Sequence, residues 1–349
     1  MRAFALVAGR KTANNGATMT SRRDFLADFL ATSLALASAP LAAQEKPTPR
    51  VYRIGMLETV PIRANNANLV ELHKGMKELG YEEGQHYLIL YRSAEGRVER
   101  FATLAADLAR QKIDVFLARG TPATIAARDT ETGIPVIASA VADPVDAKLV
   151  ASLAAPGGNV TGLTSSVNEI GAKRMELLKA LAPGITRVGV PTNPDNPASL
   201  AGWKVIEAAA PASSLKAEML EVRKPEELGD ALEASVKNGV DALIIGLETL
   251  AQSNQNQIID FAARQRLPAI YAARNFVDAG GLLSYGVLYP NLYYRAAGYI
   301  DKVLKGARPA DLPMERPTKF ELVINRKTAH ALKLAIPPDL FLRSDEVID

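Results

Sequence analysis

The sequence predicts an α/β fold built from two doubly wound lobes, and three observations predict it. Short apolar segments alternate with amphipathic ones from about residue 50 onward. The apolar segments are continuous, which is typical of strands buried on both faces of a parallel sheet. The alternation pauses near residues 160–163 and then restarts in the same order without repeating the sequence. We therefore expect two lobes of about 110 residues each.

The first lobe is expected to begin at about Arg50. Its helix Val98–Gln111 places apolar residues such as Leu104 and Leu108 on one face. Its last helix is expected to have Pro122 at the first position and Thr121 as the N-cap. The expected strands are Val51–Leu57, Tyr87–Tyr91, Ile113–Ala118 and Ile134–Ala138, and the expected helices are Ala67–Leu79, Val98–Gln111 and Pro122–Arg128.

The second set of elements repeats this architecture and ends with a late return of the chain. Together the two sets predict a cleft between the lobes, because ligands of open α/β sheets bind beyond the carboxyl ends of the strands. The expected strands are Arg187–Val190, Lys216–Leu220, Ala242–Gly246, Ala269–Ala272, Leu282–Tyr285 and Phe320–Ile324. The expected helices are Glu169–Leu181, Ala198–Ala209, Pro225–Val236, Gln255–Arg266, Tyr293–Leu304 and Arg326–Leu332.

The first 43 residues have the three parts of an export signal. The pair Arg22-Arg23 precedes a modestly apolar stretch, and small residues cluster at 37–43. The paired arginines resemble a twin-arginine signal. We expect cleavage after Ala43, with Ala39 and Ala42 as alternatives, and Met19 is an alternative start of translation. A cytoplasmic N-terminal helix is the competing interpretation. Residues 44–49 are expected to be a tether, and the product a periplasmic protein.

Charge and cysteine content exclude several classes of site and partner. Residues 1–43 carry 5 of the 41 basic and 2 of the 38 acidic side chains, which leaves 36 of each in the rest. A near-neutral chain does not indicate nucleic acid as a partner. Because the chain has no cysteine, disulfides, thiolate metal sites and a cysteine nucleophile are excluded. We find no cofactor-binding motif and expect no cofactor or metal.

Candidate ligand-binding residues follow the strands of the first lobe. Thr121 and Ala123 lie at a predicted helix start, where exposed backbone amides can bind a carboxylate. A capped helix without a ligand is the competing interpretation. Asp143 follows the next strand and can accept from a ligand ammonium group or cap the helix that Pro144 opens.

Further candidates follow the strands of the second lobe. Asn193 and Glu248 each come directly after a predicted strand. Arg274 has the forked geometry that binds carboxylates, and its neighbour Asn275 can both donate and accept hydrogen bonds. Tyr285 is expected to form an aromatic wall. Each residue alone is also consistent with surface decoration, but their convergence from separate strand ends indicates a cleft.

Four tyrosines, at 289, 293, 294 and 299, have near-helical spacing. Such spacing is more typical of one helix that packs against a core than of an aromatic ligand box. Tyr289, near the expected hinge, remains a candidate for the cleft.

One segment, Pro156-Gly157-Gly158-Asn159-Val160-Thr161-Gly162, resembles a known family when it is taken with three others. These are Gly120–Ala123, Ala142–Val145 and the late Phe320–Asn325 with Lys327–Ala329. The family is that of substrate-binding proteins of ABC importers, whose better-known members take aromatic amino acids such as tryptophan. The resemblance extends from about Arg50 to Asp349.

The resemblance implies a type I periplasmic-binding fold, with two Rossmann-like lobes joined by a hinge of three crossings. Lobe 1 would comprise residues 50–163 plus 282–305, and lobe 2 residues 164–281 plus 306–349. Thr121, Ala123, Asp143 and Asn193 match the family's ligand-facing loops.

The chain departs from the family pattern in the second lobe. Family members often carry Asp-Asn where this chain has Leu247-Glu248-Thr249, and Ser-Asp where it has Arg274-Asn275. The loss of an acidic group and the gain of a cation favour a ligand with a carboxylate and without an ammonium group at least as much as an amino acid.

The function implied is the periplasmic solute-binding component of an ABC import system. It would bind a small organic anion or amino acid by hinge closure and deliver it, as a monomer, to a permease in the inner membrane. A ligand-sensing subunit for a membrane receptor is one alternative. An exported enzyme is another, with Asp143 and Glu248 as a carboxylate pair. The sequence lacks the nucleophile-elbow, zincin and Walker motifs that would favour an enzyme.

Overall fold

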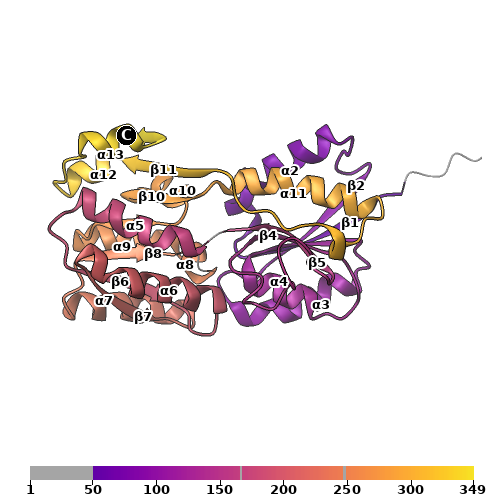
Figure 1. Ribbon diagram of the computed structural model, residues 1–349, viewed down its shortest axis with the longest axis horizontal. Helices are drawn as coiled ribbons and strands as arrows, with labels where there is room; N and C mark the ends of the chain where they lie inside the picture. Colours follow the sequence, from indigo (N-terminus) through magenta and orange to yellow (C-terminus); the bar gives the residue numbers. More distant parts are fainter. Residues whose placement is uncertain (1–49, 166, 247–248) are drawn as a thin grey trace, which may run out of the picture. The chain divides into compact units, whose positions relative to one another are not determined.

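The structure of the chain is a computed structural model that describes residues 50–165, 167–246 and 249–349 (Figure 1). For residues 167–169 we describe the backbone alone. The expected export signal and tether, residues 1–49, lie outside the described residues, and so does Glu248. All described residues belong to one compact unit.

The first sheet consists of parallel strands in the order β2-β1-β3-β4-β5. The sequence forms strands here because each segment is a short apolar run, and every residue of β3, β4 and β5 is buried. The strands are β1 (Tyr52–Glu58), β2 (Tyr87–Ser93), β3 (Val115–Arg119), β4 (Val136–Val141) and β5 (Val160–Thr164).

Helices cover both faces of this sheet, α2 and α11 on one side and α3 and α4 on the other (Figure 1). Neighbouring strand residues point to opposite faces, so Met56 packs under α2 and α11 while Leu57 packs with α3 and α4. The helices are η1 (Ile62–Asn65), α2 (Asn66–Glu78), η2 (Val98–Arg100), α3 (Phe101–Arg110), α4 (Gly120–Arg128) and α11 (Tyr289–Leu304).

The second sheet has the order β12-β11-β10-β9-β8-β6-β7, and its pairs are parallel except for β10 with β11. Leu243 of β8 packs with α7 and α9, whereas the adjacent Ile244 packs with α5 and α6 on the opposite face. The strands are β6 (Arg187–Thr192), β7 (Lys216–Glu221), β8 (Ala242–Ile245), β9 (Ala269–Tyr271), β10 (Leu283–Val287), β11 (Phe320–Asn325) and β12 (Glu346–Ile348).

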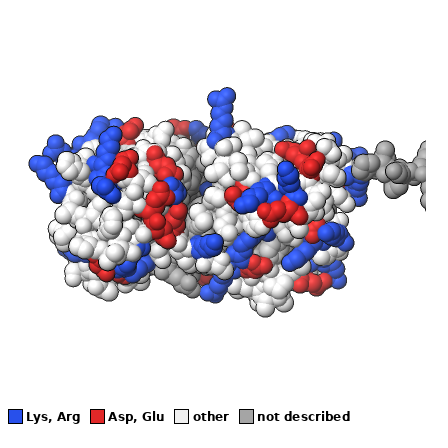
Figure 2. Space-filling view, turned by 90° about the horizontal axis from the view of Figure 1, so that it is seen from above, with Lys and Arg blue, Asp and Glu red and all other residues white. Residues whose placement is uncertain are grey.

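The remaining helices surround this second sheet or connect its strands. They are α5 (Val167–Leu181), α6 (Pro197–Ala209), η3 (Pro211–Ser213), η4 (Pro225–Glu227), α7 (Leu228–Lys237), α8 (Thr249–Ser253), α9 (Gln255–Gln265), α10 (Arg274–Asp278), η5 (Pro309–Asp311), α12 (Arg326–Ala331) and α13 (Pro338–Arg343). No helix in the described part of the chain has the length and hydropathy needed to cross a membrane. On the face shown in Figure 2, acidic and basic side chains are intermingled.

Within the described residues the chain passes between the two sheets three times: after β5, between β10 and α11, and between η5 and β11. The first sheet therefore receives α11 and the segment after η5 from late in the sequence. The Glu315 amide donates to the Gly162 carbonyl at 2.9 Å, and the Thr164 amide donates to the Glu315 carbonyl at 2.9 Å. The predicted α/β class, with two doubly wound sheets, is confirmed.

Two parts of the expected division into lobes differ from this strand pairing. We assigned residues 282–305 to lobe 1, but β10 pairs with β9 and β11 in the second sheet. We assigned residues 306–349 to lobe 2, but the segment around Glu315 pairs beside β5. An apolar run predicts that a strand forms and not which strand it will pair with, which explains the first difference. The second arises because the segment around Glu315 makes only an isolated bridge to Leu163, which no apolar run in the sequence marks.

Candidate functional site

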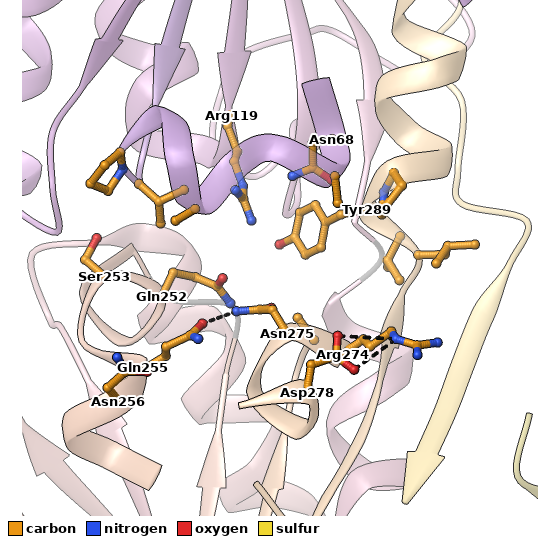
Figure 3. Close-up of a pocket in the computed structure, with 18 of the residues that line it drawn as sticks. Asn68, Arg119, Gln252, Ser253, Gln255, Asn256, Arg274, Asn275, Asp278 and Tyr289 are labelled. Carbon is orange, nitrogen blue, oxygen red and sulfur yellow. Dashed lines mark hydrogen bonds and ion pairs between the residues drawn. The ribbon is translucent and has the colours of Figure 1, made fainter. Parts of the chain in front are cut away.

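A cavity of about 560 Å³ lies between the strand ends of the two sheets, a volume that is ordinary for a small-molecule site (Figure 3). The first sheet contributes Arg119 and residues around the start of α2. The second contributes the α8–α9 region and α10, and the β10–α11 crossing forms the side. The lining residues the argument uses are Val60, Asn68, Arg119, Gln252, Ser253, Gln255, Arg274, Asn275, Asp278, Leu288, Tyr289 and Glu321.

Arg119 is the last residue of β3 and lies at the carboxyl end of the first sheet. The residue is only 6% exposed. Its Nη1 donates to Asn65 Oδ1 at 3.3 Å, and its guanidinium carbon lies 4.4 Å from the centre of the Tyr289 ring. Figure 3 shows the guanidinium pointing into the cavity beside Tyr289. A buried arginine held in this way can bind a carboxylate with its remaining N–H groups.

Glu58, the last residue of β1, lies behind Arg119 and is fully buried. Its Oε2 is 3.7 Å from Arg119 Nη1, and its Oε1 accepts a hydrogen bond from the Tyr293 hydroxyl. Burial raises the pKa of the Glu58 carboxyl, and the positive charge of Arg119 opposes that shift. Burial also raises the pKa values of Tyr289 and Tyr293, so both phenols are neutral near pH 7.

The wall opposite Arg119 consists of amides and a hydroxyl. Asn275 Nδ2 donates to Gln255 Oε1, and Ser253 Oγ donates to the Thr59 carbonyl at 2.9 Å. Gln252 is 8% exposed, and its Nε2 has no hydrogen-bond partner among the described residues. These groups both donate and accept hydrogen bonds, so this wall can bind a ligand group that is a donor or one that is an acceptor.

Arg274 lines the cavity, but its guanidinium is already occupied. It forms ion pairs with Asp278 at 3.3 Å, Glu321 at 3.2 Å and Glu346 at 2.6 Å, which together raise the pKa of Arg274. The carboxylate fork that we expected at Arg274 is therefore satisfied by the protein itself. Arg119 presents its guanidinium to the cavity instead.

Thr121 lies close to the site without capping α4. The helix begins at Gly120, whose φ of 79° few other residues adopt, and Arg119 is its N-cap residue. Thr121 Oγ1 accepts from the Ala142 amide at 3.2 Å, so it ties two loops together. It lines a small space of about 30 Å³ together with Arg119, Gln252 and Tyr289.

Four other candidates are absent from the described lining of the large cavity. Ala123 lies on α4 and is buried in the core that α3 and α4 form with the first sheet. Asp143 accepts from the Asp146 amide at 3.3 Å, and Asn193 accepts from the Asp195 amide at 2.9 Å, so both stabilise their own loops. Tyr285 stacks on Phe320 with ring centres 6.1 Å apart. Across the described residues no group of three or more histidine or acidic side chains is placed to hold a metal ion.

A family model described as "ABC transporter substrate binding protein" matches residues 54–348. The chain belongs to this family. A curated relative, the "Tyrosine-binding protein" of Clostridioides difficile (strain R20291), is 29% identical over 276 residues, which cover 78% of this chain and 79% of the relative. As the resemblance implied, the family is one of ABC transporter substrate-binding proteins.

Solved structures agree with this membership. A conserved domain protein from Vibrio cholerae has a TM-score of 0.79 and 27% identity, covering 85% of this chain and 100% of its own. An ABC domain in complex with L-Trp from Streptococcus pneumoniae has a TM-score of 0.78 and 27% identity, covering 86% of this chain and 100% of its own. The substrate-binding protein described here thus has the type I periplasmic-binding fold that we predicted.

Sequence reasoning missed Arg119 and Glu58, although a usable signal was present. Each is a charged residue that ends a strand directly after a run of buried residues, as in Val115–Arg119. Most of the expected ligand-binding residues lie in the loops after the strands, whereas Arg119 and Glu58 are the last residues of β3 and β1. The spacing of Tyr289 alone favoured a packing role. In the structure Tyr289 is a packing residue and a cleft residue at once, because it is buried and its ring lies against Arg119.

Proposed function

We propose that this substrate-binding protein is the periplasmic component of an ABC import system and binds a small carboxylate with an aromatic or other apolar body. The observation that carries the proposal is the buried guanidinium of Arg119, directed into the cavity and flanked by the Tyr289 ring. The name of the Clostridioides difficile relative and the L-Trp complex of the Streptococcus pneumoniae structure support an aromatic amino acid. Export through the N-terminal signal and delivery to an inner-membrane permease by a monomer are parts of the same proposal.

The charges of the cavity favour the carboxylate over other polar groups. Asp278 and Glu321 line it, but both are paired with Arg274, so they offer little to a ligand ammonium. An ammonium group would have to bind the carbonyl oxygens of Gln252 or Asn275. Apolar residues near the start of α2 and at the β10–α11 crossing, such as Val60 and Leu288, suit an apolar ligand body.

The test is a thermal-shift panel on protein that has been unfolded and refolded to remove bound ligand. The panel contains L-tryptophan, L-tyrosine, L-leucine, indole-3-propionate and tryptamine. A ligand at a hundred times its Kd adds about 2.7 kcal/mol, enough to raise Tm by several degrees. We expect a shift with an aromatic carboxylate, with or without its amino group, and none with tryptamine. An equal shift with tryptamine would refute the carboxylate assignment, and a shift with L-leucine alone would refute the aromatic one.

We further propose that binding closes the cleft about the three crossings. The two halves of the molecule, one around each sheet, are in contact across the cleft, which supports this proposal. Ser253 Oγ of the second half donates to the Thr59 carbonyl of the first, and Arg97 of the first half pairs with Glu226 of the second. A Cβ atom added at Gly96 would lie 3.0 Å from Ser253 Cβ, so the halves approach closely at this point.

Replacing Ser253 with phenylalanine should therefore wedge the halves apart and weaken binding of L-tryptophan tenfold or more, because only the closed fraction binds tightly. Ser253→Ala is the matched control: it loses one hydrogen bond of about 1 kcal/mol and should cost less than tenfold. Calorimetry gives the affinities, and X-ray scattering gives the ligand-induced decrease in radius of gyration. Normal compaction and affinity in Ser253→Phe would contradict the proposed contact.

A further inference from the structure

The ion pair between Glu58 and Arg119 is buried but poorly formed. Glu58 Oε2 lies 3.7 Å from Arg119 Nη1, beyond hydrogen-bond distance, and has no hydrogen-bond partner among the described residues. The same Nη1 donates instead to Asn65 Oδ1. A buried carboxylate in such a pair loses its hydration without the full compensation of a bidentate contact.

The other groups that face Glu58 are uncharged near pH 7. They come from every element packed against it: Tyr91 from β2, Asn65 from η1, and Tyr289 and Tyr293 from α11. Burial raises the pKa values of the three tyrosines, and the Glu58 charge raises them further. Within the described part of the chain, Arg119 is therefore the cation whose charge opposes the rise in the Glu58 pKa that burial causes.

A carboxylate ligand on Arg119 would compete for that charge. It would add a negative charge on the cavity side of the same guanidinium whose Nη1 lies 3.7 Å from Glu58 Oε2. Two carboxylates that share one cation at short range cannot both stay ionised without cost. A proton on Glu58 Oε2 would relieve the repulsion, and it would displace no hydrogen bond there.

We propose that Glu58 takes up one proton from solvent when a carboxylate ligand binds Arg119, so that carboxylates bind more tightly as the pH falls. Ionised Glu58 then disfavours anionic ligands, and protonated Glu58 favours them, which makes it a specificity-determining residue. This inference rests on the proposed function, because it requires the ligand carboxylate to bind Arg119.

The sign of the pH dependence follows from linkage. Burial already raises the pKa of Glu58 in the ligand-free protein, and a bound carboxylate raises it further. Between the two pKa values, binding consumes a proton, and Kd rises by up to tenfold per pH unit as the pH increases. Above and below this interval the affinity is constant, since no proton is exchanged.

The test is calorimetric titration with L-tryptophan and with indole-3-propionate between pH 6 and 8, in phosphate and in imidazole. The two buffers differ in ionisation enthalpy, so the difference in heat gives the number of protons taken up. We expect a positive uptake in the parent protein. Glu58→Gln should abolish the uptake and the pH dependence and should bind the probes more tightly at pH 8.

Glu78→Gln is the matched control. Glu78 accepts a hydrogen bond from the Tyr294 hydroxyl as Glu58 does from Tyr293, but Glu78 is exposed on α2. This variant should retain the proton uptake of the parent. No heat with any probe would contradict the proposed function, whereas heat that is the same in both buffers would contradict the role of Glu58.

A ligand-free measurement keeps the inference testable even if neither probe binds. Carbon-13 NMR of protein labelled at the glutamate carboxyl carbons follows each titration directly. We expect one glutamate to titrate above the ordinary value of about 4.3 and to disappear from the spectrum in Glu58→Gln. The absence of any such glutamate in the parent protein would overturn the inference.

Discussion

Replacing Arg119 with glutamine should weaken the binding of aromatic carboxylates by a hundredfold or more. The guanidinium is buried and directed into the cavity, so a carboxylate bound there exchanges its water for charge-assisted hydrogen bonds. Truncating one partner of such a buried pair costs about 2–5 kcal/mol, and a hundredfold is about 2.7 kcal/mol. Glutamine keeps a hydrogen-bond donor of similar reach but not the charge.

The loss should be one of binding and not of folding. Without Arg119, no other cation among the described residues pairs with the fully buried Glu58 carboxyl. The pKa of Glu58 should then rise further and the group should become neutral, which limits the cost of leaving it buried. We therefore expect Arg119→Gln to unfold close to the temperature of the parent at pH 6, as measured by circular dichroism.

Arg274→Gln is the matched control, since Arg274 is a second arginine that lines the same cavity. Its side chain is 36% exposed and already contacts Asp278, Glu321 and Glu346. Partly exposed ion pairs of this kind contribute about 1 kcal/mol or less, so affinity should change less than tenfold. Calorimetry with L-tryptophan and indole-3-propionate distinguishes the two arginines. A larger loss in Arg274→Gln than in Arg119→Gln would reverse the assignment.

The sequence was sufficient for the fold because the evidence for it is local. Continuous apolar runs such as Val115–Ala118 predict buried parallel strands, and these segments form β-strands in the structure. Strand pairing is not local. The run at Leu282–Tyr285 forms a strand as expected, yet its pairing with β9 and β11 depends on contacts that no single segment encodes.

The site was less predictable because a residue's partners decide its role. Arg274 and Arg119 both follow apolar strands in the sequence, but β11 and β12 bring Glu321 and Glu346 to Arg274. Those carboxylates lie 47 and 72 residues away along the chain. The role of Tyr289 was similarly ambiguous in the sequence. In the structure α11 begins at Tyr289, with Pro290 in its first turn, and not at Tyr293 as expected. This start places the Tyr289 ring at the crossing, against Arg119.

Replacing Gly286 with alanine should destabilise the protein by about 3 kcal/mol or more, because the backbone leaves no room for a side chain. A Cβ atom at this position would lie 1.9 Å from the Ala272 carbonyl oxygen and 2.8 Å from its carbon. These are backbone atoms of the residue directly after β9, the parallel neighbour of β10, so relief requires the two strands to separate. Urea unfolding followed by circular dichroism measures the loss.

Gly298→Ala provides the control for this substitution. Gly298 lies within α11, and apart from its chain neighbours and the backbone of its own helix an added Cβ would meet no described atom within 4 Å. Alanine is the better helix former, so this variant should gain about 0.5–1 kcal/mol in stability.

The two variants should also differ in ligand binding, because Gly286 lies three residues before Tyr289 in the chain. Separation of β10 from β9 would shift the crossing that holds the Tyr289 ring against Arg119, so Gly286→Ala should also bind L-tryptophan more weakly at temperatures where it is still folded. Unchanged stability in Gly286→Ala would show that β10 can move at little cost. The close approach of β9 to β10 would then not be what holds the Tyr289 ring against Arg119.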